Sequence, residues 1–110
     1  MKINNKNPLD LQVEQDEVIT VLIVRSIGLV ELVNYSLNAT SFPGTKPKGQ
    51  PCVFPVHKSS NLGMTVHYAQ NDGGSFSVQV TGDRGGDVSV FSANQATGEA
   101  FRTIGYMLTI

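Results

Sequence analysis

Residues 64–81 constrain the fold of this chain more than any other stretch, because two alternating segments flank a run of turn-forming residues. Met64 to Tyr68 and Phe76 to Val80 each alternate apolar and polar side chains, which is typical of a strand with one buried face. Between them, Asn71-Asp72-Gly73-Gly74 tolerates the positive φ angles of a tight turn. The stretch predicts a β-hairpin, to which the other strands add or on which they pack.

Earlier segments also favour strands. Val18 to Val24 is a β-branched run that predicts a strand buried on both faces, either as a central strand or under a partner chain. Residues 27–40 carry both helical and strand spacing, and Gly28 with its β-branched neighbours favours a strand bent or bulged there. Residues 42–51 form a long Pro/Gly loop. Cys52 to His57 is expected to be a short edge strand, because Pro55 has no N–H to donate.

The C-terminal part repeats the pattern of strand and turn. Gly82 to Asp87 predicts a second turn, Val88 to Ser92 a strand, residues 94–98 a third turn, and Ala100 to Ile110 a last strand. This regular spacing predicts an antiparallel meander or part of a Greek key. The expected fold is all-β, one antiparallel β-sandwich domain over residues 1–110, immunoglobulin-like or jelly-roll-like, with a small barrel as the alternative. Residues 1–8 are expected to be a frayed N-terminus.

The composition gives little support for several classes of function. Charged residues make up 15% of the chain and the net charge is −1, which gives no long-range attraction for nucleic acid or for an anionic membrane. Cys52 is the single cysteine, so no internal disulfide forms. No signal peptide or transmembrane segment is recognisable in the chain as given, which is expected to be soluble and whose compartment the sequence leaves open.

Alternation assigns faces to the predicted strands. The expected core positions are Val66, Tyr68, Phe76, Val78, Val80, Val88, Val90, Ile104, Tyr106, Leu108 and Ile110. The opposite face is uncharged and carries an aromatic ring among hydroxyls and an amide, a surface that suits a sugar. Its candidate ligand-binding residues are His67, Ser77, Gln79, Ser89 and Phe91. The alternatives are a plain solvated face and a face packed against another subunit.

Other chemistry has weaker support. Asp83 and Asp87 flank a glycine turn expected near Ser59 to Asn61, so they are candidate Ca²⁺ ligands, although Asp is also an ordinary turn residue. His57 and His67 occur in no metal-binding pattern, and no nucleophile-elbow motif is present. No cofactor is indicated, and the sequence favours a non-enzymatic protein over a small hydrolase or isomerase using either histidine.

The leading hypothesis is a non-enzymatic β-sandwich interaction module that self-associates as a symmetric oligomer. It depends on the apolar strand at residues 18–24, on the low charge, and on the need of open sheet edges for protection. A carbohydrate-binding, lectin-like module centred on Phe91 is the alternative.

Overall fold

The structure is a computed structural model that describes residues 1–27, 30–42, 49–68, 74–95, 98 and 101–110. The regular secondary structure of these residues consists entirely of β-strands. The described part of the chain therefore includes no helix that could serve as a membrane span. Two sheets pack against each other, so the all-β prediction is confirmed.

The larger sheet has six strands: β1 (Lys2–Lys6), β2 (Leu9–Gln12), β4 (Val30–Leu37), β5 (Thr40–Ser41), β7 (Ser60–Tyr68) and β10 (Phe101–Thr109). Their order in space is β1-β2-β10-β7-β4-β5. Neighbouring strands are antiparallel except β2 and β10, which run parallel with Leu11 opposite Leu108. The predicted purely antiparallel arrangement is therefore wrong at this pair.

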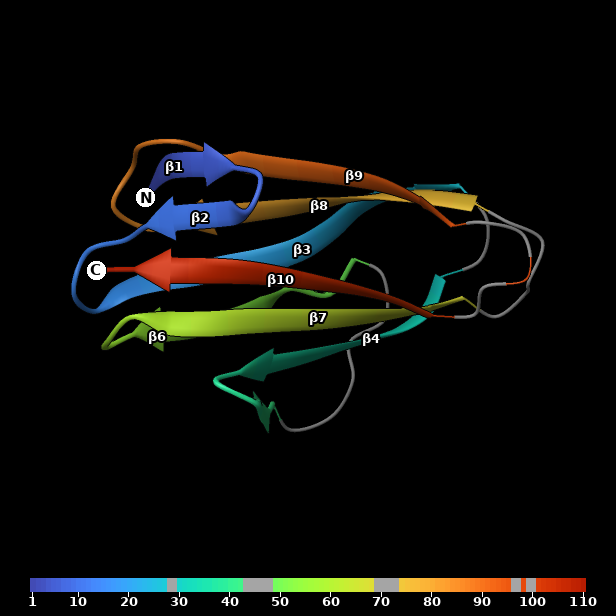
Figure 1. The fold of residues 1–110 in the computed structure, drawn as a ribbon, viewed down its shortest axis with the longest axis horizontal. Helices are drawn as coiled ribbons and strands as arrows, with labels where there is room; N and C mark the ends of the chain where they lie inside the picture. Colours follow the sequence, from blue (N-terminus) through green and yellow to red (C-terminus); the bar gives the residue numbers. More distant parts are fainter. Residues whose placement is uncertain (28–29, 43–48, 69–73, 96–97, 99–100) are drawn as a thin grey trace.

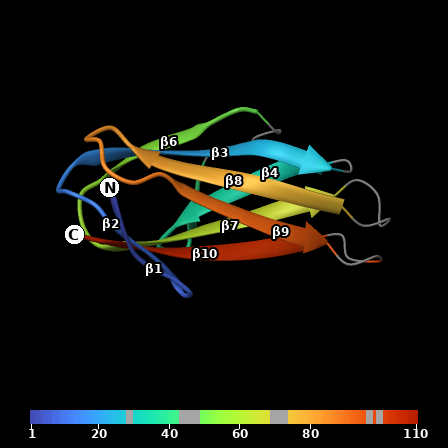
Figure 2. The ribbon, with the colours of Figure 1, turned by 90° about the horizontal axis from the view of Figure 1, so that it is seen from above.

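The smaller sheet has four strands in the order β6-β3-β8-β9: β6 (Cys52–Val56), β3 (Glu17–Ile27), β8 (Gly74–Gly82) and β9 (Ser89–Gln95). Figure 1 shows both chain ends at the same end of the molecule. Figure 2 shows β3, β6 and β8 in one layer and β4, β7 and β10 in the other. Among the described strands β6 pairs with β3 alone, which confirms the predicted edge strand.

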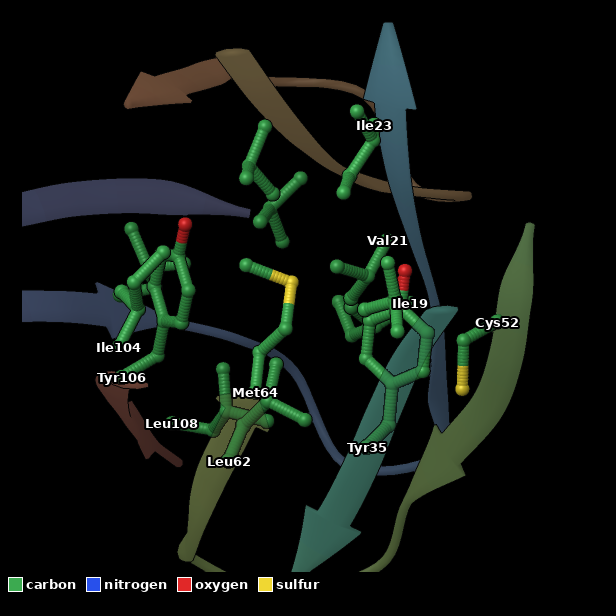
Figure 3. Packing of buried hydrophobic residues seen from close by; sticks show 14 of the residues in the cluster. Ile19, Val21, Ile23, Tyr35, Cys52, Leu62, Met64, Ile104, Tyr106 and Leu108 are labelled. Carbon is green, nitrogen blue, oxygen red and sulfur yellow. The ribbon is translucent and has the colours of Figure 1, made fainter. Parts of the chain in front are cut away.

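The core lies between the two layers. Figure 3 shows Ile19, Val21 and Ile23 of β3 facing side chains of the six-stranded sheet, among them Tyr35, Met64 and Tyr106. Burial raises the pKa of Tyr35 to about 12 and raises the pKa of Tyr106 as well, so both phenols stay neutral. Among the described residues, the buried Tyr106 hydroxyl has no hydrogen-bond partner.

The predicted hairpin at residues 64–81 is not formed. β7 pairs with β10 and β4, whereas β8 pairs with β3 and β9 in the other sheet. Alternation determines which face of a strand is buried, but it carries no information about the neighbouring strand. The five residues that separate β7 from β8, 69–73, can span about 17 Å when extended, and packed sheets lie about 10 Å apart. The connection is therefore long enough to cross to the other sheet as well as to close a hairpin.

The predicted meander is also wrong, for the same reason. β8 and β9 do form an antiparallel hairpin, with Gln79 opposite Val90, as the turn at residues 82–87 predicts. β9 and β10, however, belong to different sheets, and β10 pairs with β7 instead. From β7 onward the chain thus crosses from the six-stranded sheet to the four-stranded sheet and back again.

Residues 1–8 are not frayed. β1 pairs with β2, and the Met1 amino group is buried beside Glu17, donating hydrogen bonds to Oε2 of Glu17 at 2.9 Å and to the Gly85 carbonyl at 2.8 Å. Oε1 of Glu17 accepts a bond from the Glu14 N–H at 2.9 Å. Burial raises the pKa of Glu17, but the bonds from the Glu14 N–H and the Met1 amine outweigh it and hold that pKa below its ordinary value.

Two further predictions concern β3 and β4. β3 is fully buried on one face only: Val18, Thr20 and Leu22 are half-buried and Val24 is 45% exposed, so burial on both faces is wrong within this chain. Residues 30–37 form a strand, as favoured by the sequence, while the expected bulge at Gly28 lies outside the described residues. Most of the predicted loop at 42–51 lies outside them as well.

Candidate functional site

The five predicted ligand-binding residues do not share a face. His67 lies on the outer face of the six-stranded sheet, because its strand neighbours Val66 and Tyr68 are buried. Ser77 and Gln79 lie on the outer face of the four-stranded sheet, on the opposite side of the molecule. Ser89 and Phe91 point inward, so the predicted sugar-binding face around Phe91 does not exist.

β9 has the opposite orientation to that predicted. Ser89 is 4% exposed and Phe91 packs against the core, whereas Val90 is 63% exposed and Val88 is exposed before it. Both alternating sets of this strand are apolar, and the core takes the set with the larger ring together with Ala93. Ile110, also predicted as a core residue, is exposed as well, so that prediction is wrong.

The two candidate calcium ligands, Asp83 and Asp87, bind backbone N–H groups of two different segments instead of forming a common site. Oδ1 of Asp83 accepts a hydrogen bond from the Val18 N–H at 2.8 Å, and Oδ2 of Asp87 accepts one from the Ile3 N–H at 3.0 Å. They brace the loop between β8 and β9 against β3 and β1. Within the described residues, no group of three or more His, Cys, Asp or Glu side chains could hold a metal ion.

The two histidines have different surroundings. Nδ1 of His57 lies 2.7 Å from Oδ1 of Asp16, and this hydrogen bond lowers the Asp16 pKa. Both side chains are open to water, 70% and 57% exposed, so this imidazole–carboxylate pair is not enclosed. His67 stacks on Phe101 of the neighbouring strand, with ring centroids 4.7 Å apart.

The outer face of the four-stranded sheet exposes several valines among polar side chains. Its exposed side chains include Val24, Val53 and Val90, and Leu22 lies in a row with Gln79 and Val90 across three strands. Every side chain that the structure describes on this face is uncharged. We call it the valine face.

β9 is the open edge of this sheet. Edge strands expose unpaired N–H and C=O groups, and proteins protect them with charge, proline or very short length. β1 carries exposed Lys2 and Lys6, β5 has two residues, and β6 contains Pro55. β9 has seven residues, Ser-Val-Phe-Ser-Ala-Asn-Gln, with neither charge nor proline. Of the four edges in the described structure, only β9 lacks protection.

Sequence reasoning missed this edge for a definable reason. Its composition is visible in the sequence, but the predicted strand ended at Ser92 and its partner on each side was unknown. In a meander, the strand at 88–92 would lie inside the sheet. The edge becomes apparent only when the topology places β10 in the other sheet.

Comparisons with protein-family models, with curated proteins and with solved structures find no match to this chain. Function is therefore inferred from the residues of the chain alone.

Proposed function

We propose that this protein is a non-enzymatic association module, a β-sandwich of immunoglobulin-like or jelly-roll-like type, that pairs with a second copy of itself along β9. The single observation that carries the proposal is the unprotected seven-residue edge of the four-stranded sheet. Each copy leaves backbone donors and acceptors unused along this edge, and an identical strand can satisfy them.

The sequence of β9 is compatible with two-fold antiparallel pairing. With Ser92 on the two-fold axis, Val90 lies opposite Asn94 of the second copy, and Phe91 lies opposite Ala93. No charged side chain opposes another in this register, so the pairing carries no electrostatic penalty. The two four-stranded sheets then become one continuous sheet of eight strands.

The valine face adds apolar contact beside the junction. Val90 is 63% exposed and lies on β9 itself, so strand pairing brings it against outward-facing side chains of the second copy. Burial of apolar surface stabilises association by about 25 cal/mol for each Å² removed from water. Edge pairing therefore combines backbone hydrogen bonds with the burial of exposed valine.

The first prediction concerns the oligomeric state. Light scattering on a sizing column, over a range of protein concentrations, is expected to give the mass of a dimer. Replacing Ser92 with Lys is expected to give a monomer, because two ammonium groups would face each other on the two-fold axis. Val53→Lys places the same charge on the proline-containing edge β6 and is expected to leave the dimer intact.

Cross-linking tests the register independently of stability. Residues opposite each other in an antiparallel pair have Cα atoms about 4.5–5.5 Å apart, within the range that a disulfide spans. Under mild oxidation Ser92→Cys is expected to give a covalent dimer and Val53→Cys is not, while the native Cys52 is buried. A monomeric wild-type protein, or a dimer that Leu22→Lys dissociates and Ser92→Lys does not, would overturn pairing through β9.

A further inference from the structure

The outer face of the six-stranded sheet contains a hollow with a glycine floor. Gly105 of β10 lies directly opposite Gly63 of β7, and Ser36 of β4 continues the same row. Pro8 and Leu9 line one side of this open hollow and Ala39 the other, and its volume is about 410 Å³. Figure 1 shows β2, β10, β7 and β4 side by side, so the hollow lies over the middle of the sheet.

Gly105 has no structural reason to be glycine. Its φ angle is not among the positive values of the described glycines, and a Cβ atom added there would meet nothing within 4 Å. Glycine inside a strand costs about 0.5–1 kcal/mol relative to alanine. At Gly63, by contrast, an added Cβ would lie 2.8 Å from the Ser36 hydroxyl oxygen. The absence of a side chain at Gly105 keeps the hollow open, which points to an occupant.

Uncharged polar side chains lie beside the hollow toward Phe101, while the charged Asp10 and Lys6 lie at its β1–β2 side, opposite Met107 and Leu9. The next row toward Phe101 places Thr103, Thr65 and Asn34 side by side. These side chains face outward, because Thr65 and Asn34 lie between buried neighbours and Thr103 lies between the half-buried Arg102 and the buried Ile104. Asn61 and the exposed Met107 border the hollow on the other side. From Phe101 to Met107, every outward position of β10 is uncharged.

An exposed aromatic ring lies on the same face. Phe101 is 62% exposed although its ring is stacked at 14° on His67. It lies four residues from Gly105, or about 13 Å along the strand. Stacking on His67 holds the ring in one orientation, so little conformational entropy is lost when a ligand contacts it.

We propose that this face binds a neutral oligosaccharide, with one sugar ring in the glycine hollow and another on Phe101. A sugar ring has an apolar C–H face that packs on an aromatic ring, and its hydroxyls bond to threonine hydroxyls and asparagine amides. The separation of Gly105 and Phe101 requires a chain of several sugar units. The uncharged rows between them match an uncharged ligand.

The experiment uses the whole chain labelled with ¹⁵N. Cellotetraose, laminaritetraose, chitotetraose and mannotetraose are added separately, and amide shifts are followed by NMR. At least one of the four is expected to shift the amides of Gly63, Gly105 and Thr103, while amides of the valine face stay in place. If none of them shifts these amides at millimolar concentration, or if anionic polygalacturonate binds in preference, the proposal is overturned.

Two variants locate the site. Gly105→Val fills the hollow without backbone strain and is expected to weaken binding at least tenfold. Phe101→Ala is expected to weaken it roughly tenfold, the factor that corresponds to about 1.4 kcal/mol. Val53→Thr, on the opposite sheet, is the matched control and is expected to bind as the wild type. Full binding by both folded site variants would overturn the assignment.

This proposal is independent of dimerisation. The Ser92→Lys variant is expected to bind the same saccharide as a monomer, since β9 belongs to the other sheet. Loss of dimerisation and loss of saccharide binding are therefore separate results.

Discussion

At the scale of single residues, Glu17 is held in a buried ion pair. Its carboxylate and the Met1 amine are fully buried and 2.9 Å apart. Removing one partner of a buried ion pair leaves the other charge without compensation, which typically costs about 3–5 kcal/mol. Glu17→Gln is therefore expected to lower the free energy of unfolding by that order, as measured by urea denaturation at pH 7. An unchanged free energy would show that the pair adds nothing to stability.

The same residue gives the protein a defined acid dependence. The folded-state pKa of Glu17 is lower than the unfolded value, so its contribution to stability is fully present above the unfolded pKa. That contribution is lost as the pH falls below the unfolded pKa and through the lowered folded pKa. Thermal unfolding temperatures are expected to fall in this acid range, more steeply for the wild type than for Glu17→Gln. Parallel curves would contradict the assignment of this acid limb to Glu17.

Tyr106, in contrast to Glu17, is a position where a substitution is expected to stabilise the protein. Its hydroxyl is buried and, among the described residues, accepts and donates no hydrogen bond. An unsatisfied buried polar group costs about 1–3 kcal/mol, and phenylalanine retains the ring without the hydroxyl. Tyr106→Phe is expected to raise the free energy of unfolding by about 1 kcal/mol. If urea denaturation instead gives a lower free energy of unfolding for Tyr106→Phe than for the wild type, this hydroxyl has a hydrogen-bond partner beyond the described residues.

At the scale of elements, β9 shows where sequence reasoning reaches its limit. The two-residue period correctly identifies a strand there, but Val88 and Val90 on one side and Phe91 and Ala93 on the other are both apolar sets. In the second half of β10 the inward set is the more consistently apolar one, since Thr103, Gly105 and Thr109 lie on the outer face, and the predicted inward positions Ile104, Tyr106 and Leu108 are confirmed. The orientation of a strand is predictable only when its two faces differ.

This reversal is open to a direct stability test. Phe91 packs against the core, so Phe91→Ala is expected to lower the free energy of unfolding by about 2 kcal/mol. Val90 is exposed on the same strand, and Val90→Thr is the matched control. At protein concentrations low enough to keep the chain monomeric, this variant is expected to change the free energy of unfolding by less than about 0.5 kcal/mol. Equal effects in urea denaturation would contradict the inward orientation of Phe91.

At the scale of the whole molecule, the sequence supports the class of fold but not its topology. Alternating and β-branched segments identify most strands, because these patterns reflect burial of one strand at a time. Which strands pair depends on contacts between distant segments, such as β7 with β10. Both candidate surfaces arise from that pairing: the open edge at β9, and the hollow formed where Gly63 meets Gly105. Neither surface is visible in any single segment.

The parallel pairing of β2 with β10 has a consequence for how the protein is made. Residues 10–12 lie beside residues 107–109, and β10 separates β2 from β7 in the six-stranded sheet. During synthesis on the ribosome, this sheet cannot form completely until β10 has emerged from the exit tunnel. Sheets dominated by such distant pairings fold slowly, in milliseconds to seconds. Until β10 has been synthesised, the edges of β2 and β7 that it joins have no partner in this sheet and are accessible to chaperones.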